Sequence, residues 1–306
     1  MLALKQVLAN NLSVFGHATR LMGSDFEINV VGEDHAWANE RINSAINEIS
    51  RVEKLLSAFG DDSWANMINR NAGIAPVKVS GEVFRLVQRA LDISALTYGA
   101  FDLTYYTADK IFIDHNANTS SVIAPYSVTK TNYQGVVSDA KNCTVFLKEK
   151  GMRISFAAVS KGYAADRARY LLQMEGVNSG VIHFGNTLLT WGTQPNCQPW
   201  TIAAAFPQNK NMVAGQLDIT NMALATSVNN QKPVKKHSGL NSGFLVSDIE
   251  TIHVLSPSAE FADALTRPLI AMGINAALYL INRLNQVGCI FTDDHHRVYS
   301  SRDIQA

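Results

Sequence analysis

Residues 154–177 read ISFAAVSKGYAADRARYLLQMEGV, and they indicate the fold more strongly than any other stretch. A strand-like run, 154–159, passes directly into a helical pattern over 161–174. The amide N–H groups at the start of a helix attract anions, and Lys161 adds a full positive charge there. The segment therefore predicts a phosphate site. A lysine that only covers its own helix end is the structural alternative.

The runs on either side of this segment include helices and strands that do not alternate regularly. Regular alternation would indicate a doubly wound parallel sheet, so its absence favours the mixed (α+β) kind of α/β fold. We expect residues 1–306 to form a single mixed α/β domain with two sublobes. The other expected helices are 42–56, 83–93, one that Ser258 caps, and 275–285, with Asp34 and Ser80 as further caps. The other expected strands are 26–32, 143–147, 180–185, 201–206, 216–226, 250–256 and a last hairpin within 287–301.

Composition and charge exclude several classes of protein. Of the 306 residues, 47% are hydrophobic and 17% are charged, and the formal net charge is zero. Nucleic-acid-binding domains usually carry a basic excess, which this chain lacks. The three cysteines show no metal-ligand spacing, so no structural zinc site is expected. No apolar stretch is long enough to cross a membrane and no export signal is visible, so the chain as it stands is expected to be soluble and cytoplasmic.

The common nucleotide-binding and hydrolase motifs are absent, and two weaker candidates remain. Residues 97–104, TYGAFDLT, place small residues just past a helix end, where a ligand can approach the backbone closely. A helix cap followed by a turn accounts for the same residues. His237 lies in a Gly/Ser-rich loop, where a histidine can act as a general base. A single loop histidine is more often incidental.

The order of the motifs along the chain is more specific than any one of them. From the N-terminus, the chain shows RLMGSDFEI (20–28), RVEKLLSAFGDDSWANMINRN (51–71), TYGAFDLT (97–104), SKGYAADRA (160–168), GVIHFGN (180–186) and FADALTRPLIAMG (261–273). In this order they resemble the ApbE family of FAD:protein FMN transferases. The resemblance covers roughly residues 20–300, which is nearly the whole chain.

The resemblance implies an activity and its partners. Members of this family split the pyrophosphate of FAD with the help of Mg²⁺ and attach FMN, by a phosphoester bond, to a threonine or serine of a target flavoprotein. The metal would neutralise the pyrophosphate and the leaving AMP, and a base would help the incoming hydroxyl. We therefore expect FAD as the ligand, Mg²⁺ as the metal, and an acceptor flavoprotein with a Thr/Ser motif as the partner. Family members often work outside the cytoplasmic membrane.

The resemblance also implies roles for single residues. Lys161 would face the phosphates of the flavin nucleotide, and His237 would be the candidate base. The residues that would line the FAD site are Met22, Phe59, Ala100, Phe101, Asp102 and Ser155. The family usually has a tyrosine at the position of Phe59, so ring stacking is kept and a hydroxyl is lost. It has an aspartate at the position of Ser155.

The metal-binding motif departs from the family pattern. In the family, an aspartate and the threonine four residues later bind magnesium from one helix face. Here Asp263 is kept, but Arg267 replaces the threonine and Pro268 follows it. An arginine has no lone pair for a metal, so Arg267 is expected to pair with Asp263 instead. The alternative is a shifted metal set of the Ala158 carbonyl, Asp263 and Thr266.

Two hypotheses about function follow. In the first, the chain is a divergent FAD:protein FMN transferase that uses the shifted metal set. In the second, it is a catalytically impaired, ApbE-like FAD-binding protein in which Arg267 replaces the magnesium site. The resemblance as a whole favours the first, whereas the number of altered site positions favours the second. A third class, a protein without a ligand, would show a filled pocket.

Overall fold

The structure, a computed structural model, describes residues 12–57, 63–106, 132–203, 216–229 and 249–302. The chain divides into two compact units. Unit 1 contains Met1–Glu53 and Val159–Ala306, and unit 2 contains Lys54–Ala158. That these units form one domain with two sublobes stays a prediction. No helix in the described ranges is long and apolar enough to cross a membrane.

Unit 1 is built on one sheet that contains eight strands in the described part of the chain. Every neighbouring pair is antiparallel. In spatial order the strands are β1 (Ser13–Leu21), β2 (Ser24–Gly32), β8 (Gly180–Phe184), β9 (Thr187–Trp191), β12 (Ala223–Val228), β13 (Ile249–Ser256), β14 (Gly288–Asp293) and β15 (Val298–Ser300). The chain therefore returns to one continuous sheet from four distant parts of its sequence.

The β1–β2 hairpin turns through Met22 and Gly23. Leu21 pairs with Ser24, and both turn residues have positive φ angles, 52° and 70°. Two-residue turns of this kind match the twist of the flanking strands. A left-handed conformation costs a non-glycine residue such as Met22 about 1–2 kcal/mol. The register of the hairpin therefore holds Met22 at a fixed place beside Ser24.

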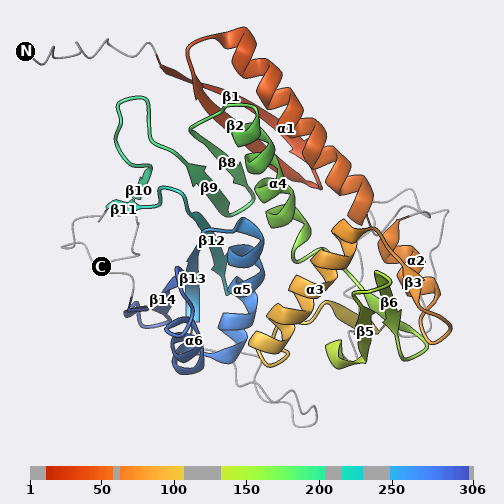
Figure 1. The fold of residues 1–306 in the computed structure, drawn as a ribbon. Coiled ribbons are helices and arrows are strands. Elements are labelled where there is room, and N and C mark those ends of the chain that lie inside the picture. Colours follow the sequence, from red (N-terminus) through yellow and green to blue (C-terminus); the bar gives the residue numbers. More distant parts are fainter. Residues whose placement is uncertain (1–11, 58–62, 107–131, 204–215, 230–248, 303–306) are drawn as a thin grey trace, which may run out of the picture. The chain divides into compact units, whose positions relative to one another are not determined.

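Helices pack on this sheet. They are α1 (His35–Leu56), α4 (Ser160–Met174), α5 (Ala259–Met272) and α6 (Ile274–Ile281). Figure 1 shows α4 and α5 side by side along the sheet, with α5 over β12 and β13. The predicted cap of α1 is confirmed, because Asp34 Oδ1 accepts a hydrogen bond from the Trp37 amide at 2.7 Å. Arg167 of α4 donates to Glu48 of α1 at 3.0 Å and so ties these two helices together.

A proline lies inside α5 without ending the helix. Pro268 is buried, and α5 continues beyond it to Met272. Proline in a helix interior removes a hydrogen bond and usually costs about 3 kcal/mol or more. The predicted cap at the other end is confirmed, because Ser258 Oγ accepts from the Phe261 amide at 3.2 Å. Burial of the apolar face around Pro268 offsets the lost bond.

A small hairpin and an apolar cluster also belong to unit 1. The hairpin pairs β10 (Thr201–Ala203) with β11 (Gln216–Asp218). The buried members of the cluster are Ile219, Leu224 and Leu255, with Leu188, Trp200, Ile202, Leu217 and Met222 packed against them. Since Leu224 lies on β12 and Leu255 on β13, this cluster adds a second layer of packing to the sheet.

The described residues of unit 2 form short strands and two helices. Its helices are α2 (Trp64–Arg70) and α3 (Gly81–Leu96), with the single turn η1 (Tyr133–Gly135). One sheet has the order β3 (Val77–Lys78), β6 (Thr144–Leu147), β5 (Val136–Asp139), and a separate pair joins β4 (Thr104–Tyr106) to β7 (Met152–Ile154). The predicted cap of α3 is confirmed, because Ser80 Oγ accepts from the Val83 amide at 3.2 Å.

Two strand predictions are wrong. The run 154–159 is not a strand: β7 ends at Ile154, and the Ala157 amide donates to Ser155 Oγ at 3.2 Å, which closes a turn. The run 216–226 is not one strand, because Asn221 has a φ of 60° and separates β11 from β12. In both places a local hydrogen bond or backbone conformation overrides the apolar pattern.

Candidate functional site

Helices α4 and α5 approach each other closely at the start of α4. A Cβ atom on Gly162 would lie 2.6 Å from the Ala259 carbonyl oxygen and 2.6 Å from Glu260 Cα. No side chain fits there, so only glycine permits this contact. The contact brings the first turn of α4, which carries Lys161, against the first turn of α5.

Lys161 lies at a junction between α4 and the β1–β2 hairpin. Its Nζ donates a hydrogen bond to Ser24 Oγ at 3.2 Å, and Ser24 directly follows the Met22–Gly23 turn. Two predicted site residues, Met22 and Lys161, are therefore brought close together within unit 1. Ser24 was missed by sequence reasoning, because nothing in the sequence shows which residue faces a lysine so distant along the chain.

Asp263 of α5 carries a half-buried carboxylate. Within the part of the chain that the structure describes, its side chain makes no hydrogen bond and no ion pair. Burial raises its pKa, and the positive charges of Lys161 and, to a smaller extent, Arg267 oppose this rise. A carboxylate taken from water without compensation is costly. Asp263 is therefore an anionic group suited to an added cation, and it lies in the field of Lys161.

The predicted Asp263–Arg267 ion pair is wrong. Although the two residues are four apart on one helix, Arg267 is exposed and no ion pair joins it to Asp263. The exposed guanidinium keeps its hydration, which the half-buried carboxylate would have to replace. Because Arg267 does not pair with Asp263, the Asp263 carboxylate can still bind a cation.

Thr266 offers a second oxygen near Asp263. Its side chain is buried, and its Oγ1 donates to the backbone carbonyl of Asp263 at 3.0 Å. A hydroxyl that donates in this way keeps lone pairs for a metal. Magnesium binds oxygen ligands and usually keeps several waters, so one carboxylate with a hydroxyl beside it suits a protein-bound Mg²⁺. The donor set of α5 fits the implied metal.

In unit 2, the predicted residues Ala100 to Asp102 follow a tight turn. Tyr98 and Gly99 have positive φ angles of 54° and 81°. Asp102 then accepts from the Thr104 amide at 2.8 Å and from the Tyr133 amide at 2.9 Å. Its carboxylate therefore organises the backbone of this loop. Phe101 is buried in the same unit.

Ser155 and Ala158 follow the β4–β7 pair of unit 2. The Ser155 amide donates to the Leu103 carbonyl at 2.9 Å, next to that pair. The structure thus brings the segments around Asp102 and Ser155 side by side. Ala158 is exposed and is the last residue of unit 2. The predicted residues Phe59 and His237 lie outside the described residues.

Two strand ends of unit 1 meet near the turn after β8. The Thr226 amide donates to the Asn186 carbonyl at 3.0 Å, so the ends of β9 and β12 lie together. Thr226 Oγ1 also lies 2.9 Å from His253 Nδ1, and burial lowers the pKa of this histidine. Sequence reasoning missed His253, because a single histidine inside a strand carries no spacing signal.

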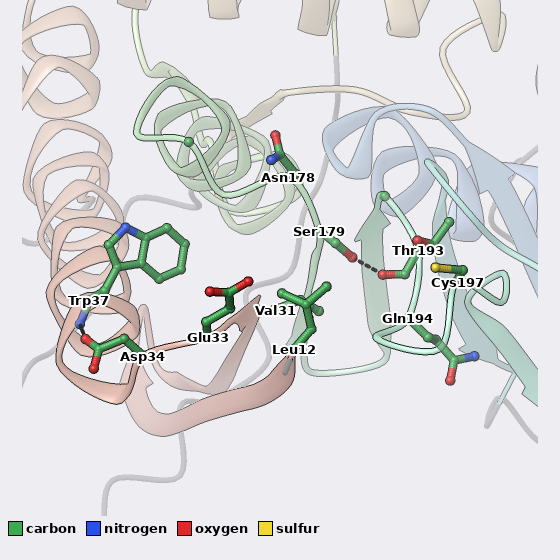
Figure 2. Close-up of a pocket in the computed structure, with 13 residues that line it drawn as sticks. Leu12, Val31, Glu33, Asp34, Trp37, Asn178, Ser179, Thr193, Gln194 and Cys197 are labelled. Atoms are coloured by element: carbon green, nitrogen blue, oxygen red, sulfur yellow. Dashed lines mark hydrogen bonds between the residues drawn. The ribbon is translucent and has the colours of Figure 1, made fainter. Parts of the chain in front are cut away.

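One cavity in unit 1 does not contain the predicted site residues. It has a volume of about 590 Å³ and is lined by Trp37, Glu33 and Ser179 among others (Figure 2). These residues come from the start of α1 and from the segment before β8. Lys161 and Asp263 are absent from its lining. The cavity is therefore separate from the Lys161–Asp263 pair.

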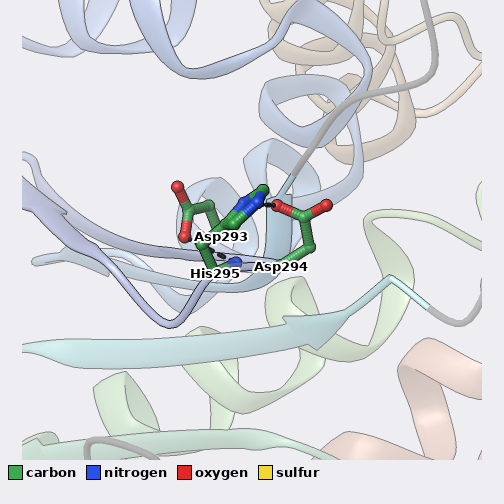
Figure 3. A group of neighbouring side chains, drawn as sticks. All are labelled: Asp293, Asp294 and His295. Carbon is green, nitrogen blue, oxygen red and sulfur yellow. Dashed lines mark hydrogen bonds and ion pairs between the residues drawn. The ribbon is translucent and has the colours of Figure 1, made fainter.

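An acidic group on the β14–β15 hairpin has a structural explanation (Figure 3). Asp293 is buried and accepts from the Arg297 amide at 2.8 Å, from Arg297 Nε at 2.7 Å and from Tyr299 Oη at 3.2 Å. Burial raises the pKa of Asp293, but the hydrogen bonds from the amide and side chain of Arg297 and from the His295 amide outweigh burial and lower the pKa to about 2. The exposed His295 pairs with Asp294 at 2.6 Å. The Asp293 carboxylate therefore holds the hairpin, and its oxygens are already used.

Comparison with known proteins places these features in a family. The model of the ApbE family matches residues 22–291. An FAD:protein FMN transferase from Klebsiella pneumoniae is 28% identical over 305 residues, which cover 95% of this chain and 91% of the relative. One from Salmonella typhimurium is 25% identical over 281 residues, covering 86% and 80%.

Solved structures agree with the fold. The flavin transferase ApbE from Vibrio cholerae matches with a TM-score of 0.75 at 18% identity, covering 95% of this chain and 98% of that one. The ApbE protein from Thermotoga maritima matches with a TM-score of 0.73 at 20% identity, covering 95% and 98%. The predicted mixed α/β, ApbE-like fold is therefore confirmed.

Proposed function

Because the chain belongs to the ApbE family, we propose that it is an FAD:protein FMN transferase, which moves FMN from FAD to a threonine or serine of a target flavoprotein. The curated relatives named above carry this activity in their names. The observation that supports it most is the pair of Lys161 and Asp263: a lysine at a helix start lies in the field of a carboxylate that has no hydrogen-bond or ion-pair partner among the described residues. One group suits a phosphate and the other suits a divalent cation.

Lys161 is proposed to bind a phosphate of the flavin nucleotide. Its ammonium group and the first turn of α4, which has no side-chain cap, both favour an anion. Ser24 accepts a hydrogen bond from Nζ and orients it. An ammonium group has three donor hydrogens, so Lys161 can keep this bond and still contact a phosphate oxygen. Met22, on the adjoining turn, is proposed to contact the same nucleotide.

Asp263 and Thr266 are proposed to hold Mg²⁺, with the backbone carbonyl of Ala158 as a further ligand. When bound, the metal supplies charge neutralisation for the pyrophosphate and the leaving AMP. The raised pKa of Asp263 means that metal and proton compete for the same oxygens. Metal affinity is therefore expected to increase with pH through the titration of Asp263.

The remaining roles are proposed from the family resemblance. His237 takes the proton of the acceptor hydroxyl as it attacks the phosphorus, and the bond to AMP breaks. The residues proposed to line the FAD site are Phe59, Ala100, Phe101, Asp102 and Ser155. Arg267 is exposed and unpaired with Asp263, so it gives no support to the hypothesis that it replaces the metal.

The proposal is tested by following both products of the transfer. The protein is incubated with FAD, MgCl₂ and a target flavoprotein domain, and the mass of the target and the release of AMP are measured. We expect an FMN adduct on the acceptor threonine and one AMP for each adduct. A target with that threonine changed to valine is the control and should stay unmodified. AMP release without an adduct would show an FAD hydrolase and would overturn the proposal.

A further inference from the structure

Asp166 joins the two helices that carry Lys161 and Asp263. It belongs to α4, yet its carboxylate accepts three hydrogen bonds from the start of α5. Oδ1 accepts from the Ala259 amide at 3.0 Å, and Oδ2 accepts from the Glu260 amide at 3.0 Å and from Ser258 Oγ at 2.7 Å. These amides are among those a helix start leaves without an internal partner.

The contact differs from an ordinary helix cap. Ser258 already caps α5 through the Phe261 amide. Asp166 adds a full negative charge at the same helix start, which its dipole favours, and does so from another helix. Arg169 also contacts this carboxylate: it donates to Asp166 Oδ1 at 3.3 Å and to the Pro257 carbonyl at 3.0 Å. The link is therefore a bridge between elements rather than a local cap.

The bridge has a direct consequence for the candidate site. Lys161 stands five residues, about one and a half turns, before Asp166 on α4, and Asp263 stands about one turn after Ala259 on α5. Gly162 lets the two helices touch at this level. Sliding or tilting of α5 against α4 would change the distance between Lys161 and Asp263. Three bonds to one carboxylate oppose such movement.

We propose that Asp166 is a positioning residue, which holds Asp263 at a fixed place relative to Lys161 and so sets the affinity of α5 for a divalent cation. The inference rests on the proposed function in one respect, the metal role of Asp263. Residues that support metal ligands without touching the metal typically change affinity about 10- to 100-fold when they are altered. The same range is expected for Asp166.

The test compares Mn²⁺ binding to the FAD-free protein by electron paramagnetic resonance. The variant Asp166→Asn keeps the shape but offers an NH₂ group to amides that need an acceptor. We expect its dissociation constant for Mn²⁺ to rise at least about 10-fold. In the transfer assay, the Mg²⁺ concentration for half-maximal rate should rise more than kcat falls. Ser258→Ala, which keeps both backbone bonds to Asp166, should change Mn²⁺ affinity much less.

The matched control is Ser80→Ala, which removes the cap of α3 in unit 2. Its thermal stability should fall by about as much as that of Asp166→Asn, while its Mn²⁺ affinity should not change. If Asp166→Asn does not fold, Arg169→Met takes its place and should weaken Mn²⁺ binding by a smaller factor. The proposal is overturned if the Asp166 variant, or its replacement, binds Mn²⁺ as tightly as Ser80→Ala does.

The outcome also separates this inference from the proposed function. A wild-type protein that binds Mn²⁺ through Asp263 but transfers no FMN would refute the transferase and leave the role of Asp166 standing. A wild-type protein that transfers FMN while Asp166→Asn keeps full Mn²⁺ affinity would refute the positioning role alone. No Mn²⁺ binding by the wild type would overturn the inference outright.

Discussion

Asp263 carries a charge that the described part of the fold does not neutralise. Burial raises its pKa, and neither Lys161 nor Arg267 forms an ion pair with it. A carboxyl whose folded pKa is above its unfolded value stabilises the fold below the unfolded pKa, near 4, and this contribution is lost as pH rises through the folded pKa. At neutral pH the ionised group therefore opposes folding until a cation binds.

Asp263→Asn should consequently separate stability from activity. Without metal at pH 7, the variant is expected to unfold at the same or a higher temperature than the wild type, because the unpaired charge is gone. FMN transfer should fall at least about 100-fold, since a metal ligand worth several kcal/mol is lost. Thermal denaturation measures the unfolding temperature, and the transfer assay measures the loss of FMN transfer. A variant that unfolds at a markedly lower temperature would contradict the view that Asp263 has no partner in the part of the chain that the structure describes.

Lys161→Met should weaken the binding of FAD. An interaction between a charged donor and a phosphate contributes roughly 1.5–3 kcal/mol, which corresponds to about a 10- to 100-fold change in dissociation constant. Fluorescence titration of FAD measures the change. Lys141→Met, at an exposed position of unit 2, is the control and should leave the affinity unaltered. Equal affinities for both variants would remove Lys161 from the FAD site.

At the scale of elements, the sequence predicted what local chemistry controls. The caps Asp34, Ser80 and Ser258 were recognised because a side-chain oxygen meets an amide three residues later. Strand β1 was missed, because its pairing depends on the Met22–Gly23 turn and on a partner strand. The turn at 155–157 was missed because it depends on a local hydrogen bond, in which Ser155 Oγ accepts from the Ala157 amide.

The close contact of α4 and α5 gives a prediction at this scale. Gly162→Ala would place a methyl group 2.6 Å from backbone atoms of α5, which cannot move without shifting that helix. We expect a loss of about 1–3 kcal/mol in the free energy of unfolding. Because α5 carries Asp263, Mn²⁺ affinity should fall as well. The control is Ala168→Gly, which loosens α4 at a position away from this contact. Gly23→Ala is not a suitable control, because Gly23 has a positive φ. A fully stable Gly162→Ala protein would contradict the packing.

The β14–β15 hairpin predicts a pH dependence. The hydrogen bonds from the amide and side chain of Arg297 and from the His295 amide keep the pKa of Asp293 at about 2, below its unfolded value near 4. The stability it contributes is present above about pH 4 and is lost as pH falls from about 4 to about 2. Asp293→Asn should therefore be less stable than the wild type at pH 7, with the gap narrowing below pH 4. Urea unfolding at pH 7 and pH 3 measures the stability of the wild type and of the variant. An equal difference in stability at the two pH values would refute the role given to the Asp293 carboxylate.

At the scale of the whole molecule, the order of motifs along the chain is enough to indicate the family. Spacing within a motif is local, but the order of several motifs reflects the entire fold. What the sequence could not show is which distant residues meet. Ser24 and Asp166 are ordinary residues in the sequence, and only the packing of unit 1 places them beside Lys161 and the start of α5.

Thiol chemistry checks the fold of unit 1 as a whole. Cys197 is exposed, whereas Cys289 is buried in β14, and burial raises the pKa of its thiol to about 12. A thiol with such a pKa has almost no reactive thiolate at pH 8. In the native protein a maleimide should label Cys197 within minutes and leave Cys289 unlabelled until denaturant is added. Peptide mapping identifies the labelled cysteines. Labelling of Cys289 before denaturant is added would contradict its burial in the sheet.

The central claim is that this chain transfers FMN in a reaction that needs a metal held by Asp263. The most direct measurement follows FMN attachment to a target flavoprotein and FAD binding in parallel, with MgCl₂ or with a chelator. We predict attachment with magnesium, its loss with the chelator, and its recovery when magnesium is restored to the wild type but not to Asp263→Asn. No attachment under any condition, with FAD bound equally well in the presence of chelator, would contradict the claim.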